Sequence, residues 1–177
     1  MSLGWTWDGP GDGTSPYTES PLNSIDSAVD GGVVWVNAAG NEAESSWHGA
    51  YLDSDSDGYL EFVSGDETNH VYLSAGENIT IYLRWDDDWG TADSDLDLSI
   101  WDYSSYSGWT KLDESNDAQN GTLGQEPIEV LTFTAPWSDT FHLVVSHESG
   151  PAPGWFQLVV WGAEVEIPIS DRSVANP

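Results

Sequence analysis

The sequence predicts a mainly β protein, in which a jelly-roll-like antiparallel β-sandwich follows one helix–strand unit. From residue 47 onward, short runs rich in β-branched and aromatic residues alternate with turns, at the spacing of a sandwich. Within several of these runs, apolar and polar residues alternate with a period of two. Before them, one stretch has the period of a helix and continues through two glycines into an apolar segment. A chain of 177 residues, 38% of them hydrophobic, can bury one main core of this kind.

The composition is strongly acidic. Thirty-one Asp and Glu residues stand against three Lys and Arg, a formal net charge of -28. Nucleic acid and anionic membranes are therefore excluded as partners, whereas cations are favoured. The chain has no cysteine, hence no disulfide and no thiol nucleophile, and its four histidines lack the spacing of a metal motif. No apolar run approaches the roughly 20 residues of a membrane-spanning helix.

Residues 21–30 are expected to form a short amphipathic helix. Ser20 suits the N-cap, Pro21 suits the first helical position, and the two glycines after Asp30 suit the C-terminal stop. Four apolar residues share one face: Leu22, Ile25, Ala28 and Val29. The apolar run at 33–36 is then expected to be a buried strand, ending in a turn that displays the side chain of Asn41.

Eight strands are expected in the sandwich. The odd-numbered apolar residues between 79 and 85 face the core, and the runs 141–145 and 156–160 repeat this pattern. The expected strands are residues 59–64, 71–74, 78–85, 96–101, 109–114, 128–134, 140–146 and 155–161. Eight short strands suit a jelly roll.

The first quarter of the chain resembles the helix–strand–asparagine section of subtilisin-like serine proteases, whose fold is α/β. The resemblance is carried by Gly-Thr-Ser-Pro at 13–16, by the helix and double glycine at 25–32, and by Val-Val-Trp-Val-Asn-Ala-Ala-Gly-Asn-Glu at 33–42. In that family the asparagine donates a hydrogen bond to the oxyanion of the tetrahedral intermediate. The resemblance therefore implies that Asn41 is the oxyanion-hole residue of a parent endopeptidase. Without the resemblance, Asn41 is a turn residue after a strand.

The catalytic Asp, His and Ser of that family are not identifiable in this sequence. Gly-Thr-Ser at 13–15 also matches the start of the family's nucleophile motif. That motif, however, follows the asparagine in chain order and has alanine two residues after the serine, where Tyr17 stands here. Ser15 is therefore not the nucleophile, and this chain by itself is expected to be inactive.

Residues 47–163 are similar to bacterial pre-peptidase C-terminal-type β-sandwich domains, which accompany secreted proteases. The similarity is carried by the runs at 75–90, 94–100 and 127–131, while residues 173–177 resemble a return to a subtilisin-like sheet. The resemblances imply part of a longer, extracellular or cell-surface protein. Its expected divisions are a partial catalytic segment at 1–46, an inserted sandwich at 47–165 and a return segment at 166–177. The implied partners are the rest of the catalytic domain, protein substrates, and a second copy of this chain through the strand at 33–36.

Three carboxylates stand at alternate positions before a glycine: Asp53, Asp55 and Asp57. This is the spacing of a calcium loop, in which Tyr59 contributes its carbonyl oxygen. Ser64 stands where an EF-hand has its bidentate glutamate, so a complete EF-hand is not expected. The carboxylates able to complete the coordination are Glu61, Asp66 and Glu67. The alternative is a solvated acidic turn on an acidic protein.

A second acidic cluster brackets the turn between the expected strands 78–85 and 96–101. Asp95 and Asp97 share the strand face opposite the apolar one, where they can close over a cation with Asp86 or Asp88. Charges this crowded favour a bound divalent ion or a raised carboxylate pKa. Calcium is thus the expected cofactor at both clusters.

Three functions remain open on the sequence. The first is a fragment of a secreted subtilisin-like serine endopeptidase, with a sandwich that modulates substrate access or stability. The second is a non-catalytic module that binds calcium and a protein or carbohydrate; its 11 tryptophans offer stacking surfaces, although core packing is their commoner role in a sandwich. The third is an acidic stability domain whose only ligands are cations.

Overall fold

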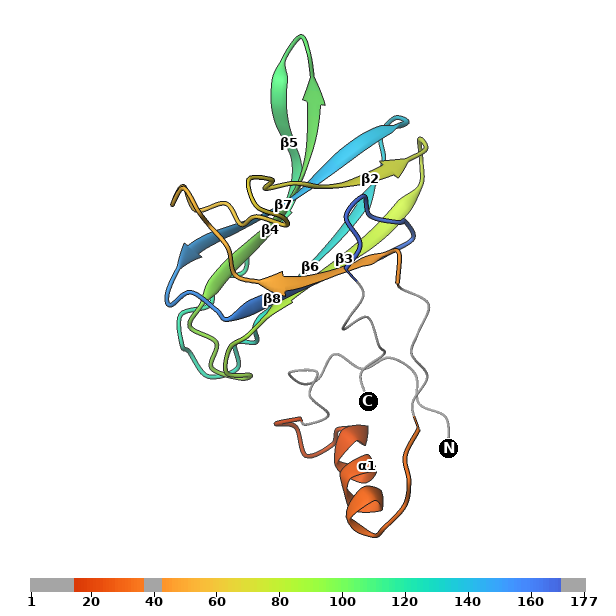
Figure 1. Ribbon diagram of the computed structural model, residues 1–177, viewed down its shortest axis with the longest axis vertical. Coiled ribbons are helices and arrows are strands. Elements are labelled where there is room, and N and C mark those ends of the chain that lie inside the picture. The colour runs from red at the N-terminus through yellow and green to blue at the C-terminus, as the bar shows by residue number, and fades with distance from the viewer. Residues whose placement is uncertain (1–14, 37–42, 170–177) are drawn as a thin grey trace.

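The computed structural model describes residues 15–36 and 43–169, and within them the chain forms one helix and eight strands (Figure 1). The elements are α1 (Pro21–Asp30), β1 (Ser46–Ala50), β2 (Asn69–Leu73), β3 (Asn78–Trp85), β4 (Asp95–Ser104), β5 (Gly108–Ser115), β6 (Ile128–Thr134), β7 (Asp139–Ser149) and β8 (Trp155–Trp161). In this part of the chain, no helix has the length and apolar character needed to cross a membrane.

The strands form two four-stranded antiparallel sheets, ordered β1-β8-β3-β6 and β2-β7-β4-β5. Each strand pairs with its counterpart from the other end of the chain: β1 with β8, β2 with β7, β3 with β6 and β4 with β5. Successive strands change sheet at every connection except the β4–β5 hairpin. This is the connectivity of a jelly roll. The predicted class, a mainly β antiparallel sandwich with one short helix before it, is confirmed.

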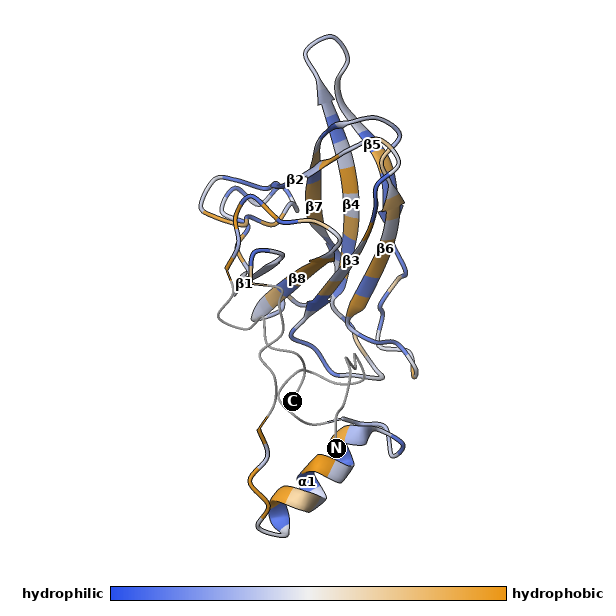
Figure 2. Ribbon diagram, turned by 90° about the vertical axis from the view of Figure 1, so that its right-hand side faces the viewer, coloured by the Kyte–Doolittle hydropathy of each residue, from blue (hydrophilic) through white to orange (hydrophobic). Residues whose placement is uncertain are grey.

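The core lies between the two sheets and follows the predicted alternation. The apolar odd-numbered residues of β3 are buried, and Figure 2 shows hydrophobic and hydrophilic residues alternating along the strands. Near one end of the core, Phe156 packs against the rings of Trp47 and Phe62, with centroid distances of 4.4 and 5.8 Å. The indole N–H of Trp47 donates to the Phe62 carbonyl at 3.1 Å, so this buried ring keeps its hydrogen bond.

Seven of the eight predicted strands are present, with ends that differ by at most a few residues. The predicted strand at 59–64 is wrong, because this segment is held by isolated bridges and not by a ladder. Leu60, Glu61 and Phe62 are all buried, so burial in this segment does not alternate as it does in a strand with one exposed face. Glycines with positive φ, Gly58 at 93° and Gly65 at 80°, turn the chain on either side of them.

The strand that the sequence did not predict is β1. Its five residues include no β-branched side chain, so they lack the composition typical of a strand. Gly49 is required by packing: a side chain there would collide with the indole ring of Trp47. Pairing with β8, not local propensity, therefore makes this segment a strand.

The chain enters and leaves the sandwich at neighbouring positions. The Val165 amide donates to the Glu44 carbonyl at 2.8 Å, and the Ile169 amide donates to the Ser46 carbonyl at 2.9 Å. On its other side, this terminal segment exchanges hydrogen bonds with the amide side chain of Asn69. The predicted division between residues 165 and 166 thus falls inside a segment that is attached to the sandwich.

Helix α1 forms at the predicted residues, with the Ser20 hydroxyl accepting from the Leu22 amide at 3.2 Å. The predicted strand is wrong at 33–36: these residues have no strand conformation, and Val34 and Val36 are 86% and 84% exposed. A strand needs a neighbour to satisfy its backbone, and no described segment pairs with this run. Asn41 lies outside the described residues. A dimer through this run therefore stays a prediction without a strand to support it.

Candidate functional site: an acidic turn

The candidate site is the acidic turn, residues 53–58. Carboxylate oxygens of Asp53, Asp55 and Asp57 all lie within 4.8 Å of one another. Within the described residues, this is the one group of three or more histidine or carboxylate side chains close enough to share a metal ion. The structure thus brings together the three carboxylates that the sequence spacing selected.

Local backbone geometry closes the acidic turn. Ser56 and Gly58 have φ values of 62° and 93°, left-handed conformations that curl the chain. The Gly58 amide donates to Oδ2 of Asp53 at 3.3 Å, and the Tyr59 amide donates to Oδ1 of Asp57 at 2.9 Å. These bonds hold the first and last carboxylates of the turn in place.

Glu61 is buried and anchors the turn to the next loop. Its carboxylate accepts from the Ser54 amide at 2.9 Å, from the Ser54 hydroxyl, and from the Gly65 amide at 2.6 Å. The Ser54 hydroxyl and then the Gly65 amide lower the pKa of Glu61, because they bond to its charged form. Asp66 is engaged by the amide and hydroxyl of Thr68, both at 3.0 Å. Glu61 and Asp66, two of the three carboxylates that the sequence offered to complete the calcium coordination, are therefore engaged in hydrogen bonds within the protein.

The acidic turn is also fixed to strand β7. The Leu60 amide donates to the Val145 carbonyl at 2.9 Å, and the His147 amide donates to the Gly58 carbonyl at 2.8 Å. These bonds flank Tyr59, so in antiparallel geometry its own N–H and C=O point away from β7. The Tyr59 carbonyl, which the sequence proposed as a ligand, therefore lies on the side of the acidic turn.

Asp53 supplies the observation that favours a cation here. Its Oδ1 atom is buried and has no hydrogen-bond partner among the described residues. Nearby, burial and then the charge of Asp53 raise the pKa of Tyr51, whose hydroxyl lies 3.0 Å from Nδ1 of His147. A buried carboxylate oxygen without a donor is costly, and two further carboxylates beside it add repulsion. A hard divalent cation with oxygen ligands removes both penalties.

The second predicted cluster is not brought together. Its carboxylates, Asp86, Asp88, Asp95 and Asp97, form no group of the required closeness in the described chain. Asp87, which belongs to the same acidic run but was not among the expected ligands, organises the turn by accepting from three backbone amides between residues 88 and 94. The Asp95 carboxylate accepts from the Gln119 amide at 3.1 Å. A second calcium site at these four residues therefore has no geometric support.

Asp97 shows a raised carboxylate pKa, which is the alternative to a bound ion that crowded carboxylates favour. It lies on β4, on the face opposite the buried Leu96 and Leu98. Burial, followed by the charges of Glu148 and Asp95, raises the pKa of Asp97 to about 7. An aspartate in the unfolded chain titrates near pH 4, so the native state binds an additional proton between these values.

Stability is therefore expected to fall as the pH rises through 7. Between about pH 5.5 and about pH 8 the free energy of unfolding should drop by about 1–2 kcal/mol, after allowance for solvent screening of this half-buried group. Asp97→Asn should stabilise the protein at the higher pH and remove this part of the slope. Denaturant unfolding at both pH values measures the effect, with the exposed Asp113→Asn as control. Equal slopes for wild type and Asp97→Asn would contradict the assignment.

A pocket that the sequence did not predict lies on the outer face of the β2-β7-β4-β5 sheet. Its volume is about 270 Å³, and it is lined by Tyr59, Glu67, Thr68, Trp101, Trp109 and Val144. These residues come from separate segments of the chain, so no local motif marks them. The available signal was the abundance of tryptophan, which composition alone cannot assign to core or surface.

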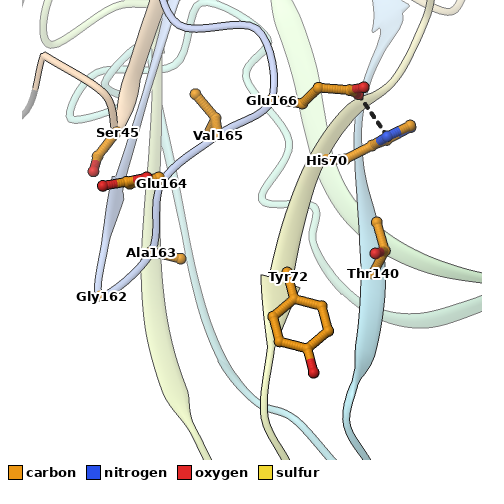
Figure 3. A pocket seen from close by; sticks show the side chains of 9 residues that line it. All are labelled: Ser45, His70, Tyr72, Thr140, Gly162, Ala163, Glu164, Val165 and Glu166. Carbon is orange, nitrogen blue, oxygen red and sulfur yellow. Dashed lines mark ion pairs between the residues drawn. The ribbon is translucent and has the colours of Figure 1, made fainter.

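A wider hollow, of about 910 Å³, lies where residues 162–166 pass strand β2 (Figure 3). Nδ1 of His70 pairs with Glu166 at 2.6 Å across it, and Nε2 of His70 lies 3.0 Å from the Thr68 hydroxyl. The ring of His142 packs edge-on against His70, with centroids 4.3 Å apart. Both ring nitrogens of His70 therefore have partners within the protein.

Comparison with solved structures finds similarity to three β-sandwich proteins. The pre-peptidase C-terminal domain of collagenase from Bacillus anthracis is 13% identical, over 67% of this chain and 89% of that one, with a TM-score of 0.41. CorA, described as a surface-associated copper-binding protein important in Methylomicrobium album BG8 copper acquisition, is 13% identical over 68% and 94%, with a TM-score of 0.40. A family 35 carbohydrate binding module from Clostridium thermocellum is 9% identical over 66% and 93%, with a TM-score of 0.29.

No family model matches the chain, and no curated protein matches it. The first of the three structures is of the class that residues 47–163 resemble, and none of the three is a subtilisin-like catalytic domain. At these identities and TM-scores, the function of this chain has to be argued from its own residues.

Proposed function

We propose that this chain is a non-catalytic binding module, a β-sandwich whose acidic turn holds a calcium ion. The observation that carries the proposal is the closeness of carboxylate oxygens of Asp53, Asp55 and Asp57, in a turn where Oδ1 of Asp53 is buried without a hydrogen-bond partner among the described residues. The Tyr59 carbonyl is the further oxygen donor. A bound calcium ion would offset two of the three negative charges that the carboxylates place in this turn. Oxygen donors at this density suit calcium better than zinc or copper, which favour nitrogen and sulfur.

Calcium is expected to stabilise the folded protein. A ligand that binds only the native state adds about 2.7 kcal/mol at a hundredfold excess over its dissociation constant, which for a chain of this size corresponds to about 5–10 °C in Tm. Thermal unfolding in calcium chloride and in EGTA measures this difference. Asp55→Asn should abolish most of the shift, whereas Asp113→Asn, on the exposed face of β5, should retain it. An unchanged Tm for the wild type would reject the calcium site.

A second candidate places the sandwich within a secreted subtilisin-like endopeptidase, with Asn41 as the oxyanion donor of that parent. The observation that favours an inserted domain is the pairing of residues 44–46 with 165–169, because an insertion needs neighbouring ends. The parent reading frame tests it: Asp and His motifs upstream and Gly-Thr-Ser-x-Ala downstream are required. In such a parent, replacing residues 45–168 by a short Gly-Ser linker should slow cleavage of a folded protein more than cleavage of a peptide. Equal effects on both substrates would reject a role in substrate access.

A further inference from the structure

The aromatic pocket on the outer face of the β2-β7-β4-β5 sheet has the features of a ligand site that does not depend on calcium. Val144 is only 7% exposed and lies on β7 itself, so it forms the base of the pocket. Two rings at its rim are left in water: Tyr59 is 38% exposed and Trp109 is 51% exposed. Exposed aromatic surface that surrounds a small hollow is the usual form of a ligand site.

The two tryptophan rings of the pocket are held in fixed orientations. The indole N–H of Trp101 donates to the Ser99 hydroxyl at 2.8 Å. Trp109 packs edge-on against His142, with centroids 4.6 Å apart and an interplanar angle of 80°, and it also contacts Tyr103 at 5.1 Å. A ligand therefore meets a preorganised aromatic surface and does not have to order it.

The pocket is electronegative. The Glu67 carboxylate lines it and has no hydrogen-bond or ion-pair partner within the described residues. Burial, and then the charges of Asp57 and Asp55, raise the pKa of Glu67, which places this carboxylate in the negative field of the acidic turn. An anionic ligand is repelled here, and a neutral one leaves the Glu67 charge uncompensated.

A cation of the chain already lies on this aromatic surface. Nζ of Lys111 is 5.5 Å from the centroid of the Trp101 ring and pairs with Glu114. Lys111 is one of just three basic residues in the sequence. An ammonium group over the face of an indole gains electrostatic attraction from the ring.

We propose that this pocket binds an alkylammonium group, with Tyr59, Trp101 and Trp109 as its aromatic walls and Glu67 as its counter-charge. Its size suits one such group, presented either by a small quaternary amine or by a lysine side chain of another polypeptide. Lys111 is an internal competitor for the Trp101 face. Cation recognition by aromatic rings and a carboxylate requires no calcium, so this proposal and the calcium proposal can fail separately.

The test is an NMR titration of the indole N–H resonances of Trp101 and Trp109 at constant ionic strength, in calcium and in EGTA. Choline is the small-amine probe, and its neutral isostere 3,3-dimethyl-1-butanol is the matched control. Choline should bind at least about fivefold more tightly than the isostere, because the shape is shared and only the charge differs. N-acetyl-Gly-Lys-Gly-amide and its Nε-acetylated form then distinguish a polypeptide source from a free amine.

Variants separate this site from its alternatives. Trp109→Ala and Glu67→Gln should each weaken choline binding by about fivefold, and Trp109→Phe should weaken it less because a ring face remains. Trp137→Ala, an exposed tryptophan outside the pocket, is the control and should change nothing. Lys111→Ala should strengthen choline binding by about twofold or more, since it removes the competing ammonium.

Two results would overturn the proposal. One is equal binding of choline and its neutral isostere. The other is weaker binding in Lys111→Ala together with perturbation of the same resonances by cellobiose, which would instead identify a carbohydrate site.

Discussion

Raising the NaCl concentration from about 0.01 M to about 1 M is expected to raise the free energy of unfolding by on the order of 3 kcal/mol. The cause is the formal net charge of -28 on 177 residues, which the folded state confines to a small surface. Over this range the Debye length falls from about 30 Å to about 3 Å, so repulsion between separate carboxylates is largely screened. Urea unfolding in EGTA measures the effect without a contribution from calcium.

A variant with fewer surface charges is the control for the salt effect. Asp113, Asp117 and Asp139 are exposed, and their combined change to asparagine should reduce the salt dependence. It should also raise stability at low salt. A free energy of unfolding that does not change with NaCl would show that repulsion between the acidic side chains does not destabilise the folded state.

Phe156→Ala is expected to destabilise the protein by about 3–5 kcal/mol. Phe156, on β8, is fully buried and contacts the rings of Trp47 on β1 and Phe62 in the 59–64 segment. Its removal leaves a cavity that these rigid neighbours cannot refill. Chemical denaturation measures the loss, and Tyr106→Ala, at a fully exposed tyrosine on the β4–β5 hairpin, should stay within about 0.5 kcal/mol of the wild type. A loss below about 1.5 kcal/mol for Phe156→Ala would mean that this end of the core is loosely packed.

The strands of the sandwich could be predicted because the residue patterns that mark most of them lie within each strand and its flanking turns. Apolar and polar residues alternate in β3, and β3, β6 and β8 begin and end where the sequence indicates. In the segment 59–64, the spacing of Leu60 and Phe62 in the sequence suggested a strand, yet positive-φ glycines turn the chain on both sides and only isolated bridges form. Strand β1 carries no such signal, since its conformation comes from β8. Period alone cannot separate an irregular buried segment from a strand.

The same distinction holds for the candidate sites. Asp53, Asp55 and Asp57 lie within five consecutive residues, so their spacing fixes their closeness. The cluster around Asp95 depended on the conformation of the turn between β3 and β4, and the backbone amide of Gln119 donates to the Asp95 carboxylate instead. The aromatic pocket joins segments up to 85 residues apart, from Tyr59 to Val144, and could emerge only from the folded chain.

Calorimetric titration of chelator-treated protein with calcium chloride measures directly whether the acidic turn binds calcium. We expect saturable binding to the wild type, binding weakened by about tenfold or more in Asp55→Asn, and unchanged binding in Asp113→Asn. Absence of saturable binding to the wild type, or equal affinity in Asp55→Asn, would contradict a calcium site in the acidic turn.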